Sequence, residues 1–296
     1  MRISIFLNRL HQTFGQRLAA YVEVARMIDE AGIYSVHLGD HLVMGEALDR
    51  YPYGTFPVER EAAWMEPLTT LAAMSSVTKT LRLSTGVVIV PLRTAVLFAK
   101  TVATLDVLSG GRMELGVGTG WQADEYAAAG VPWAQRNQIL DDAIRASRLL
   151  WTGETVSFDS PSVSFARIVA RPVPIQQRIP ILFGVSGTAS NAKRIAELGD
   201  GWCPVGLTAE QMSAGVRELR SAFEHAGRNA DSLQVRAALP PVFGDRGPID
   251  VKATMADAAR WLDAGATTVS IGPPVHLQSL DEYRRFVDEV AEYVSV

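Results

Sequence analysis

The sequence predicts an α/β fold in which eight strand–helix units close into a barrel. Two observations favour this fold class. Eight runs of β-rich sequence recur along the chain, and segments of helical period lie between them, which predicts a parallel sheet. The chain has 296 residues and is 48% hydrophobic, which suffices for the single large core of such a barrel. We therefore expect one domain, residues 1–296.

Each strand candidate is an alternating or continuous run of apolar and β-branched residues. In chain order, the candidates cover residues 3–7, 34–38, 81–90, 112–117, 179–183, 201–205, 234–239 and 267–271.

The segments between these runs carry helix signals. Leu18, Val22, Ala25 and Ile28 share one helical face after the first strand candidate. Late helices are expected to open at capping boxes, and others to end at glycines. The capping boxes are Thr208-x-x-Gln211 and Ser279-x-x-Glu282, and the terminal glycines are Gly32, Gly199 and Gly265.

One segment, residues 152–178, breaks the alternation. It contains Gly153, Pro161, Pro172 and Pro174, which makes it too interrupted for a long helix, and it is too long for an ordinary barrel connection. The full prediction is therefore a (β/α)8 TIM barrel with an insertion between the fourth and fifth βα units. Such barrels place their active sites at the carboxyl ends of the strands.

Composition limits the partners. The net charge is −4 and the basic residues are scattered, so we expect neither nucleic acid nor a membrane surface as a partner. The expected partner is a small molecule. The single cysteine, Cys203, excludes an internal disulfide and is expected to be buried. No His and carboxylate cluster has metal-ligand spacing, so we expect no metal. With no signal peptide or membrane span recognised, a cytoplasmic location is expected.

The second strand candidate ends at Asp40 and His41, where polar groups can face a ligand. An ordinary histidine titrates near neutral pH, and an adjacent carboxylate could fix its tautomer, so His41 is the leading acid/base candidate. A pair that merely caps the loop is the alternative. Glu125 and Arg136 follow the fourth strand candidate, and we expect solvated or interhelical ion pairs for them rather than catalysis.

Glycines mark the ends of three further strand candidates. Gly86 interrupts a β-branched run, which predicts a bulge or a close approach to a ligand. The fourth strand candidate leaves through 116–121, where a ligand can meet bare backbone. The fifth leaves through 184–188 directly into a helix, so it offers a phosphate cradle, with a simple capping turn as the alternative.

These segments together resemble the luciferase-like monooxygenase superfamily, and most closely its F420-dependent oxidoreductase branch. The resemblance extends over essentially the whole chain. Its blocks are residues 31–42, 66–73, 81–87, 104–112, 116–121 and 198–202.

The resemblance implies roles for individual residues. Asp40 and His41 match the pair beside the deazaflavin ring, and Trp121 joins them as a catalytic-site candidate. A bulge with a non-prolyl cis peptide is implied behind the ring. The implied cofactor-binding positions are Asp40, His41, Gly86, Val87, Val88, Thr119, Gly120, Ser186, Gly187 and Thr188.

Two departures from the family pattern bear on the ligands. Val185 and Ser186 stand where relatives usually have two glycines in the phosphate loop. Trp121 stands where the sugar-phosphate dehydrogenases of the family carry a catalytic glutamate, so a sugar phosphate is not the expected substrate. Trp121, with Met44, Trp64 and Met65 as looser candidates, instead suits a planar or apolar substrate.

The resemblance implies an enzyme that transfers a hydride between C5 of the deazaflavin coenzyme F420 and a small organic substrate, with His41 handling a proton. An FMN-dependent monooxygenase is the first alternative, and a non-catalytic flavin-binding protein is the second. A homodimer is the assembly usual in the family. No role is assigned to His11, His225 or His276.

Overall fold

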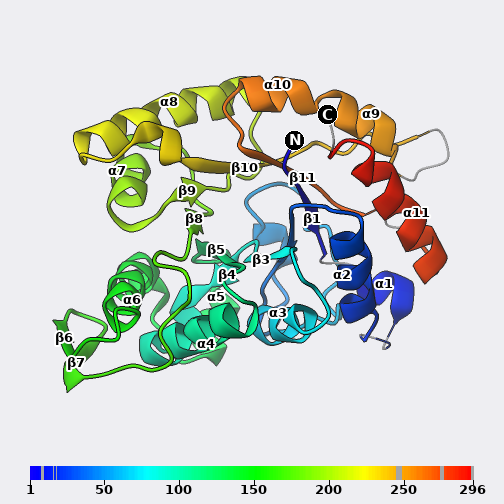
Figure 1. Cartoon of the computed structure of the whole chain (residues 1–296). Helices are drawn as coiled ribbons and strands as arrows, with labels where there is room; N and C mark the ends of the chain where they lie inside the picture. Colours follow the sequence, from blue (N-terminus) through cyan, green and yellow to red (C-terminus); the bar gives the residue numbers. More distant parts are fainter. Residues whose placement is uncertain (8–9, 16, 18, 245–248, 274–276, 295–296) are drawn as a thin grey trace.

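The computed structural model contains a closed parallel barrel with helices arranged around it (Figure 1). The structure describes residues 1–7, 10–15, 17, 19–244, 249–273 and 277–294. The barrel strands are β1 (Ile3–Phe6), β2 (Ser35–Leu38), β3 (Arg82–Thr85), β4 (Val88–Ile89), β5 (Met113–Gly118), β8 (Ile181–Phe183), β9 (Gly201–Trp202), β10 (Gln234–Ala238) and β11 (Thr268–Ile271).

The strand order confirms the predicted barrel. The sheet runs β3-β2-β1-β11-β10-β9-β8-β5-β4, and an additional β3–β5 pairing closes it. All of these pairings are parallel. Since β3 and β4 are two halves of one interrupted strand, the barrel has eight strand positions.

The interruption lies where the sequence predicts it. The peptide bond between Gly86 and Val87 is cis, as the family resemblance implies. The sixth strand position differs from the expectation, because β9 ends at Trp202 rather than at residue 205. Pro204 follows and has no N–H to donate to a neighbouring strand.

Helices cover the outside of the barrel (Figure 1). The predicted box at Thr208 and Gln211 is present in full at the start of α8. At the start of α11 only half of the predicted box forms, because the Glu282 carboxylate accepts the N–H of Gln278 instead of that of Ser279.

The helices are α1 (Leu10–Phe14), α2 (Ala20–Glu30), α3 (Pro67–Ser75), α4 (Ala95–Leu108), α5 (Ala123–Ala128), α6 (Arg136–Leu150), α7 (Ala189–Leu198), α8 (Ala209–His225), α9 (Val251–Ala256), α10 (Ala258–Asp263) and α11 (Leu280–Ala291).

The segment 152–178 carries an antiparallel pair, β6 (Val156–Asp159) and β7 (Ser164–Ile168), which forms a sheet separate from the barrel. Figure 1 shows this pair projecting beyond α6. The segment thus has the interrupted, non-helical structure expected of it. That it is an insertion relative to other barrels stays a prediction.

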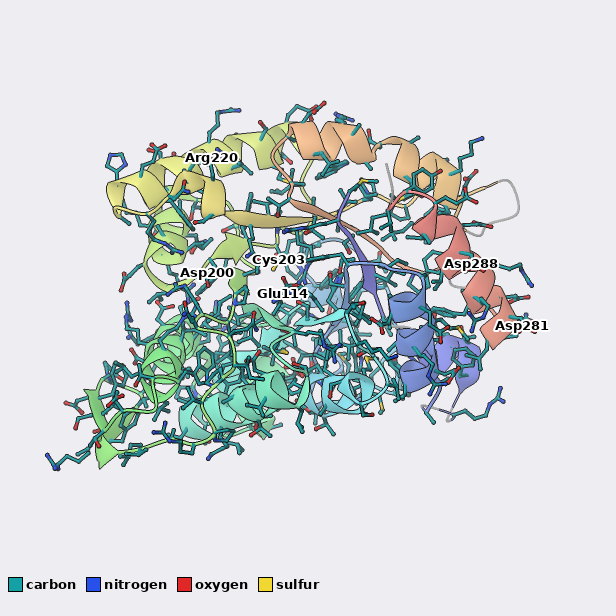
Figure 2. The ribbon with its side chains drawn as sticks, viewed as in Figure 1. Glu114, Asp200, Cys203, Arg220, Asp281 and Asp288 are labelled. Atoms are coloured by element: carbon teal, nitrogen blue, oxygen red, sulfur yellow. The ribbon has the colours of Figure 1, made fainter. Side chains whose placement is uncertain are left out.

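The interior of the barrel is polar near its centre. The His37 ring lies between Ser4 Oγ, at 2.8 Å from Nδ1, and Ser270 Oγ, at 3.3 Å from Nε2. Burial, with the nearby charge of Arg236 adding to it, holds the pKa of His37 well below its usual value. Cys203 is buried with a free thiol, as predicted. Figure 2 shows Cys203 and Glu114 near the centre, whereas Asp281 and Asp288 lie on the outer helix α11.

No helix in the described ranges combines the length and the apolar character needed to cross a bilayer.

One carboxylate fixes the turn that leads into the third strand position. Asp29, on α2, accepts hydrogen bonds from the backbone N–H groups of Lys79, Thr80 and Leu81 and from the Thr80 hydroxyl, at 2.7–2.9 Å. Partial burial acts to raise the pKa of Asp29, but these four donors together lower it below its ordinary value.

We predict that Asp29→Ala lowers the free energy of unfolding at pH 7 by about 2 kcal/mol, because three backbone donors lose their acceptor. The folded-state pKa is depressed, so this contribution is complete above the unfolded pKa and is lost as the pH falls through the folded one. Urea unfolding at pH 7 and below pH 4 tests both parts. The control is Asp288→Ala, which removes an exposed carboxylate on α11. An equal loss of unfolding free energy in both variants would refute the role of Asp29.

Candidate functional site

A cavity of about 710 Å³ opens at the carboxyl ends of the barrel strands, where the fold predicts an active site. Its walls come from the loops that follow β2, β3, β5, β8 and β9 and from the first turns of α6 and α7. One end of the cavity is aromatic, the floor is backbone and aliphatic, and the other end is polar. The lining residues that define these parts are Tyr51, Tyr53, Phe56, Trp64, Trp121, Gly86, Val87, Ile89, Asn137, Asp141, Ser186, Ser190, Asn191 and Arg194.

Aromatic rings surround His41 at one end. The centroid of its ring lies 4.7 Å from that of Trp64, 5.7 Å from that of Phe56 and 6.0 Å from that of Trp121. Tyr51 closes the group at 5.3 Å from Trp121. The buried indole N–H of Trp64 has no hydrogen-bond partner among the described residues.

The His41 imidazole is held by Glu125, a residue for which the sequence favoured a solvated or interhelical ion pair. That expectation is wrong. The Glu125 side chain is fully buried, and its Oε2 lies 3.0 Å from His41 Nδ1. Its Oε1 accepts the N–H of Leu42 at 2.9 Å. A carboxylate can only accept, so Nδ1 donates, and the Nε2 atom remains for proton exchange.

Asp40 does not orient His41, contrary to the expectation from their adjacency. Its two carboxylate oxygens accept from Arg93, Oδ2 from Nη1 at 2.6 Å and Oδ1 from Nη2 at 3.0 Å. Oδ2 also accepts the N–H of Ile89 at 2.8 Å. Neighbouring residues at a strand end point in different directions, so Asp40 braces the floor while His41 faces the cavity.

The floor is the interrupted third strand. Gly86, Val87 and Ile89 line the cavity, whereas Val88 is buried below it. The Val87 side chain occupies space left free by two glycines of neighbouring strands: a Cβ at Gly118 or Gly184 would lie 2.7 Å from its methyl groups. The floor therefore depends on glycine at both positions.

Gly120, in the predicted exit segment, has φ +64°, and a Cβ there would meet Ile89 at 2.8 Å. Its neighbour Thr119 lines the cavity with Gly120 and Trp121, as the resemblance implies. The Tyr126 hydroxyl donates to the Thr119 carbonyl at 2.5 Å and so fixes this segment.

The polar end contains only part of the predicted phosphate loop. Ser186 lines the cavity, but Gly187 packs against Trp202, and Thr188 caps α7 by accepting the N–H of Asn191 at 3.3 Å. The additional groups come from two helices, α6 and α7. They are Asn137, Asp141, Ser190, Asn191 and Arg194.

Within this polar end, Arg194 Nε donates to Asp141 Oδ1 at 2.5 Å, and the Asn191 amide donates to the Ser186 carbonyl at 2.9 Å. Burial raises the pKa of Asp141 above its ordinary value, with Arg194 opposing the shift. Hydroxyl, amide and guanidinium groups that lie close together can donate hydrogen bonds to an anionic group of an organic ligand, such as a phosphate ester.

Several functional residues were not found from the sequence. Tyr51 and Phe56 lie in a long loop without periodicity, where the density of aromatic residues between 51 and 64 is the available signal. Ser190, Asn191 and Arg194 recur on one side of the first turns of a helix, a spacing that could have been used.

The remaining candidates lie outside the cavity lining. Met44 contacts the Gln122 amide, and Met65 lies beneath the aromatic end. Arg136 stacks on Trp133 at 3.9 Å. His11 pairs with Glu59 and His225 contacts Ser221, while His276 lies outside the described residues. Across the described part of the chain, no three His, Cys, Asp or Glu side chains could together hold a metal ion.

Comparison with known proteins gives one family. The family model described as luciferase-like monooxygenase matches residues 1–288. An uncharacterized protein of Mycobacterium tuberculosis is 35% identical over 237 residues, covering 80% of this chain and 79% of the relative. The F420-dependent hydroxymycolic acid dehydrogenase of the same species is 31% identical over 281 residues, covering 92% of this chain and 70% of the relative.

Solved structures share the fold at lower identity. The monooxygenase RslO1 from Streptomyces bottropensis has a TM-score of 0.80 at 21% identity, with 100% of this chain and 99% of that chain covered. An F420-dependent secondary alcohol dehydrogenase, solved with an F420-acetone adduct, has a TM-score of 0.78 at 17% identity and covers 99% and 98% of the two chains.

We predict that Asp40→Asn lowers the free energy of unfolding by about 3 kcal/mol, because it leaves the buried Arg93 with Glu66 as its only carboxylate partner among the described residues. Chemical denaturation measures the loss. Glu46→Gln, which breaks the exposed pair with Arg60, should change stability by less than about 1 kcal/mol. A stable Asp40→Asn protein would contradict the bracing role.

Proposed function

The chain belongs to the luciferase-like monooxygenase family, and within that family we propose that it is an F420-dependent oxidoreductase acting on a small, uncharged organic substrate. The observation that carries this proposal is the buried His41–Glu125 pair, which presents one proton-exchanging atom inside an aromatic cavity. A relative with 31% identity is an F420-dependent dehydrogenase, which supports the cofactor assignment.

The cavity fits a ring cofactor with an anionic chain. Its floor is formed by Gly86, Val87 and Ile89, and its volume of about 710 Å³ lies within the range of pockets for drug-sized ligands. The polar end would hold a phosphate group through Ser186, Ser190, Asn191 and Arg194. When bound, F420 supplies a ring carbon that gives or accepts a hydride.

His41 is proposed as the proton-handling residue. With Nδ1 donating to the Glu125 carboxylate, Nε2 can accept a proton from a substrate hydroxyl as its carbon loses hydride, or return one in the reverse direction. Glu125 is a positioning residue, since it fixes the tautomer and favours the imidazolium that forms.

The aromatic end selects the substrate. Ring faces and edges surround His41, and they come from Tyr51, Phe56, Trp64 and Trp121. Among the described lining residues, this end of the cavity contains no Lys or Arg side chain. Burying a phosphate or carboxylate there without a partner would be costly, whereas an apolar alcohol, ketone or unsaturated carbonyl compound would be favoured.

We predict that F420 binds with micromolar or lower Kd and that FMN binds at least about tenfold more weakly. Fluorescence titration measures both. Arg194→Gln should weaken F420 binding by about tenfold through the loss of a charge-assisted hydrogen bond, while Arg217→Gln, on the exposed face of α8, should not. Tighter binding of FMN would instead support the monooxygenase alternative.

We predict that His41→Gln retains F420 affinity but loses turnover by a factor on the order of 10² to 10⁴. Glu125→Gln should lose about 10- to 10²-fold, because the imidazole keeps its place but loses the charge beside it. Steady-state kinetics with a panel of apolar alcohols and ketones measures both values.

Asp124→Asn, on the exposed side of the same helix, is the matched control for Glu125→Gln. Full turnover in His41→Gln would remove His41 from the mechanism. Intact F420 binding with no turnover on any substrate in the wild type would favour a non-catalytic cofactor-binding protein.

A further inference from the structure

A buried cation lies inside the barrel beneath the cavity floor. Arg236 projects inward from β10 and is 6% exposed. Its Nη1 donates to Ser84 Oγ and its Nη2 donates to the Thr85 carbonyl, each at 2.7 Å. The buried Cys203 thiol is a further hydrogen-bond neighbour of this guanidinium.

None of these partners is anionic. Within the described ranges, no carboxylate oxygen lies within 4 Å of the Arg236 guanidinium. By contrast, the guanidinium groups of Arg82, Arg93 and Arg148 each have at least one carboxylate partner at that distance. The two titratable groups beside it do not favour a counter-charge. Burial lowers the pKa of His37 and raises the pKa of the Cys203 thiol, and each shift favours the uncharged form. A buried charge without a counter-charge is unusual, because desolvation normally requires one.

The guanidinium lies directly below the floor. Its acceptor, the Thr85 carbonyl, belongs to the residue before the Gly86–Val87 break. A Cβ built on Gly86 would lie 2.3 Å from the His37 ring and 3.3 Å from Arg236 Nη2, so the imidazole and the guanidinium lie side by side below this residue. A Cβ built on Gly116 would lie 2.8 Å from Arg236 Nη2. Two glycines thus let the cation reach the underside of the backbone that lines the cavity, and little polarizable solvent separates it from a ligand above.

We propose that Arg236 is a positioning residue whose charge makes the cavity select the ionised, negatively charged form of a planar cofactor ring. This inference rests on the proposed binding of F420, whose oxidised ring has an ionisable hydroxyl and carries a delocalised negative charge once that proton is lost. The bound ring would supply the counter-charge that the described residues do not provide.

A purely structural role is the competing explanation, since Arg236 also ties Ser84 and Thr85 of β3 to β10. The two roles differ in what they require. Holding the floor requires hydrogen-bond donors, which glutamine also provides, whereas favouring the ring anion requires positive charge, which lysine also provides.

The test is an absorbance titration of oxidised F420 bound to the protein. In the wild type, the ring should ionise at a pH about one unit or more below that of free F420, a tenfold shift in its acid dissociation constant. Arg236→Gln should reverse most of this shift, and Arg236→Lys should retain it. Other titratable or charged groups lie in or around the cavity. They are His37 and Cys203 beside Arg236, and the pairs Asp40 with Arg93, Asp141 with Arg194, and His41 with Glu125. His41→Gln is therefore titrated in parallel to separate the contribution of this histidine.

Equal ring pKa values in the wild type and Arg236→Gln would overturn the inference, as would a bound ring in the wild type that ionises at the same pH as the free one. The second comparison needs no variant, so it holds even if Arg236→Gln does not fold. Failure of the wild type to bind F420 at all would refute the proposed function instead, and the two failures are therefore distinguishable.

Discussion

The geometry of the cavity depends on the buried carboxylate of Asp40. This side chain follows β2, yet it accepts the N–H of Ile89 in β4 and two hydrogen bonds from Arg93. It therefore connects the end of one strand to the far side of the break in the next. His41, the next residue along the chain, is held separately, through the hydrogen bond between its Nδ1 and the Glu125 carboxylate.

The cavity region uses its two neighbouring carboxylates for different tasks. Asp40 is matched to an arginine, so its charge is compensated permanently. Glu125 is matched to a histidine, whose charge can change during a reaction. Both carboxylates are buried, so neither interaction is strongly screened by water. The adjacency of Asp40 and His41 in the sequence suggested one catalytic pair, but their side chains have separate partners, Arg93 shortly after β4 and Glu125 in α5.

The sequence was sufficient for the barrel, because eight β-rich runs with helical segments between them leave few other arrangements. It also located the break at Gly86. It placed His41 and Trp121 just after predicted strands, where the alternation of the strand and the barrel fold together determine the position of a residue. It could not pair His41 with Glu125, which lie 84 residues apart and meet only when the loop after β2 packs against α5. It likewise missed Tyr51 and Phe56, because an irregular loop carries no periodic pattern that marks the side facing a ligand. Arg194 was missed although its helical spacing from Ser190 was available as a signal.

The distribution of charge explains why such a cavity would bind an elongated ligand in one orientation. The aromatic end offers ring surfaces and a histidine, and the polar end offers hydroxyl, amide and guanidinium groups. The floor lies above Arg236, which has no carboxylate partner among the described residues. A planar ring is favoured over the floor and an anionic chain is favoured at the polar end, while the reverse placement would bury the anion among aromatic side chains. The same arrangement leaves the space beside His41 for a second, uncharged molecule. In the proposed function, binding orientation and substrate polarity would therefore be set by the same three regions of the barrel mouth.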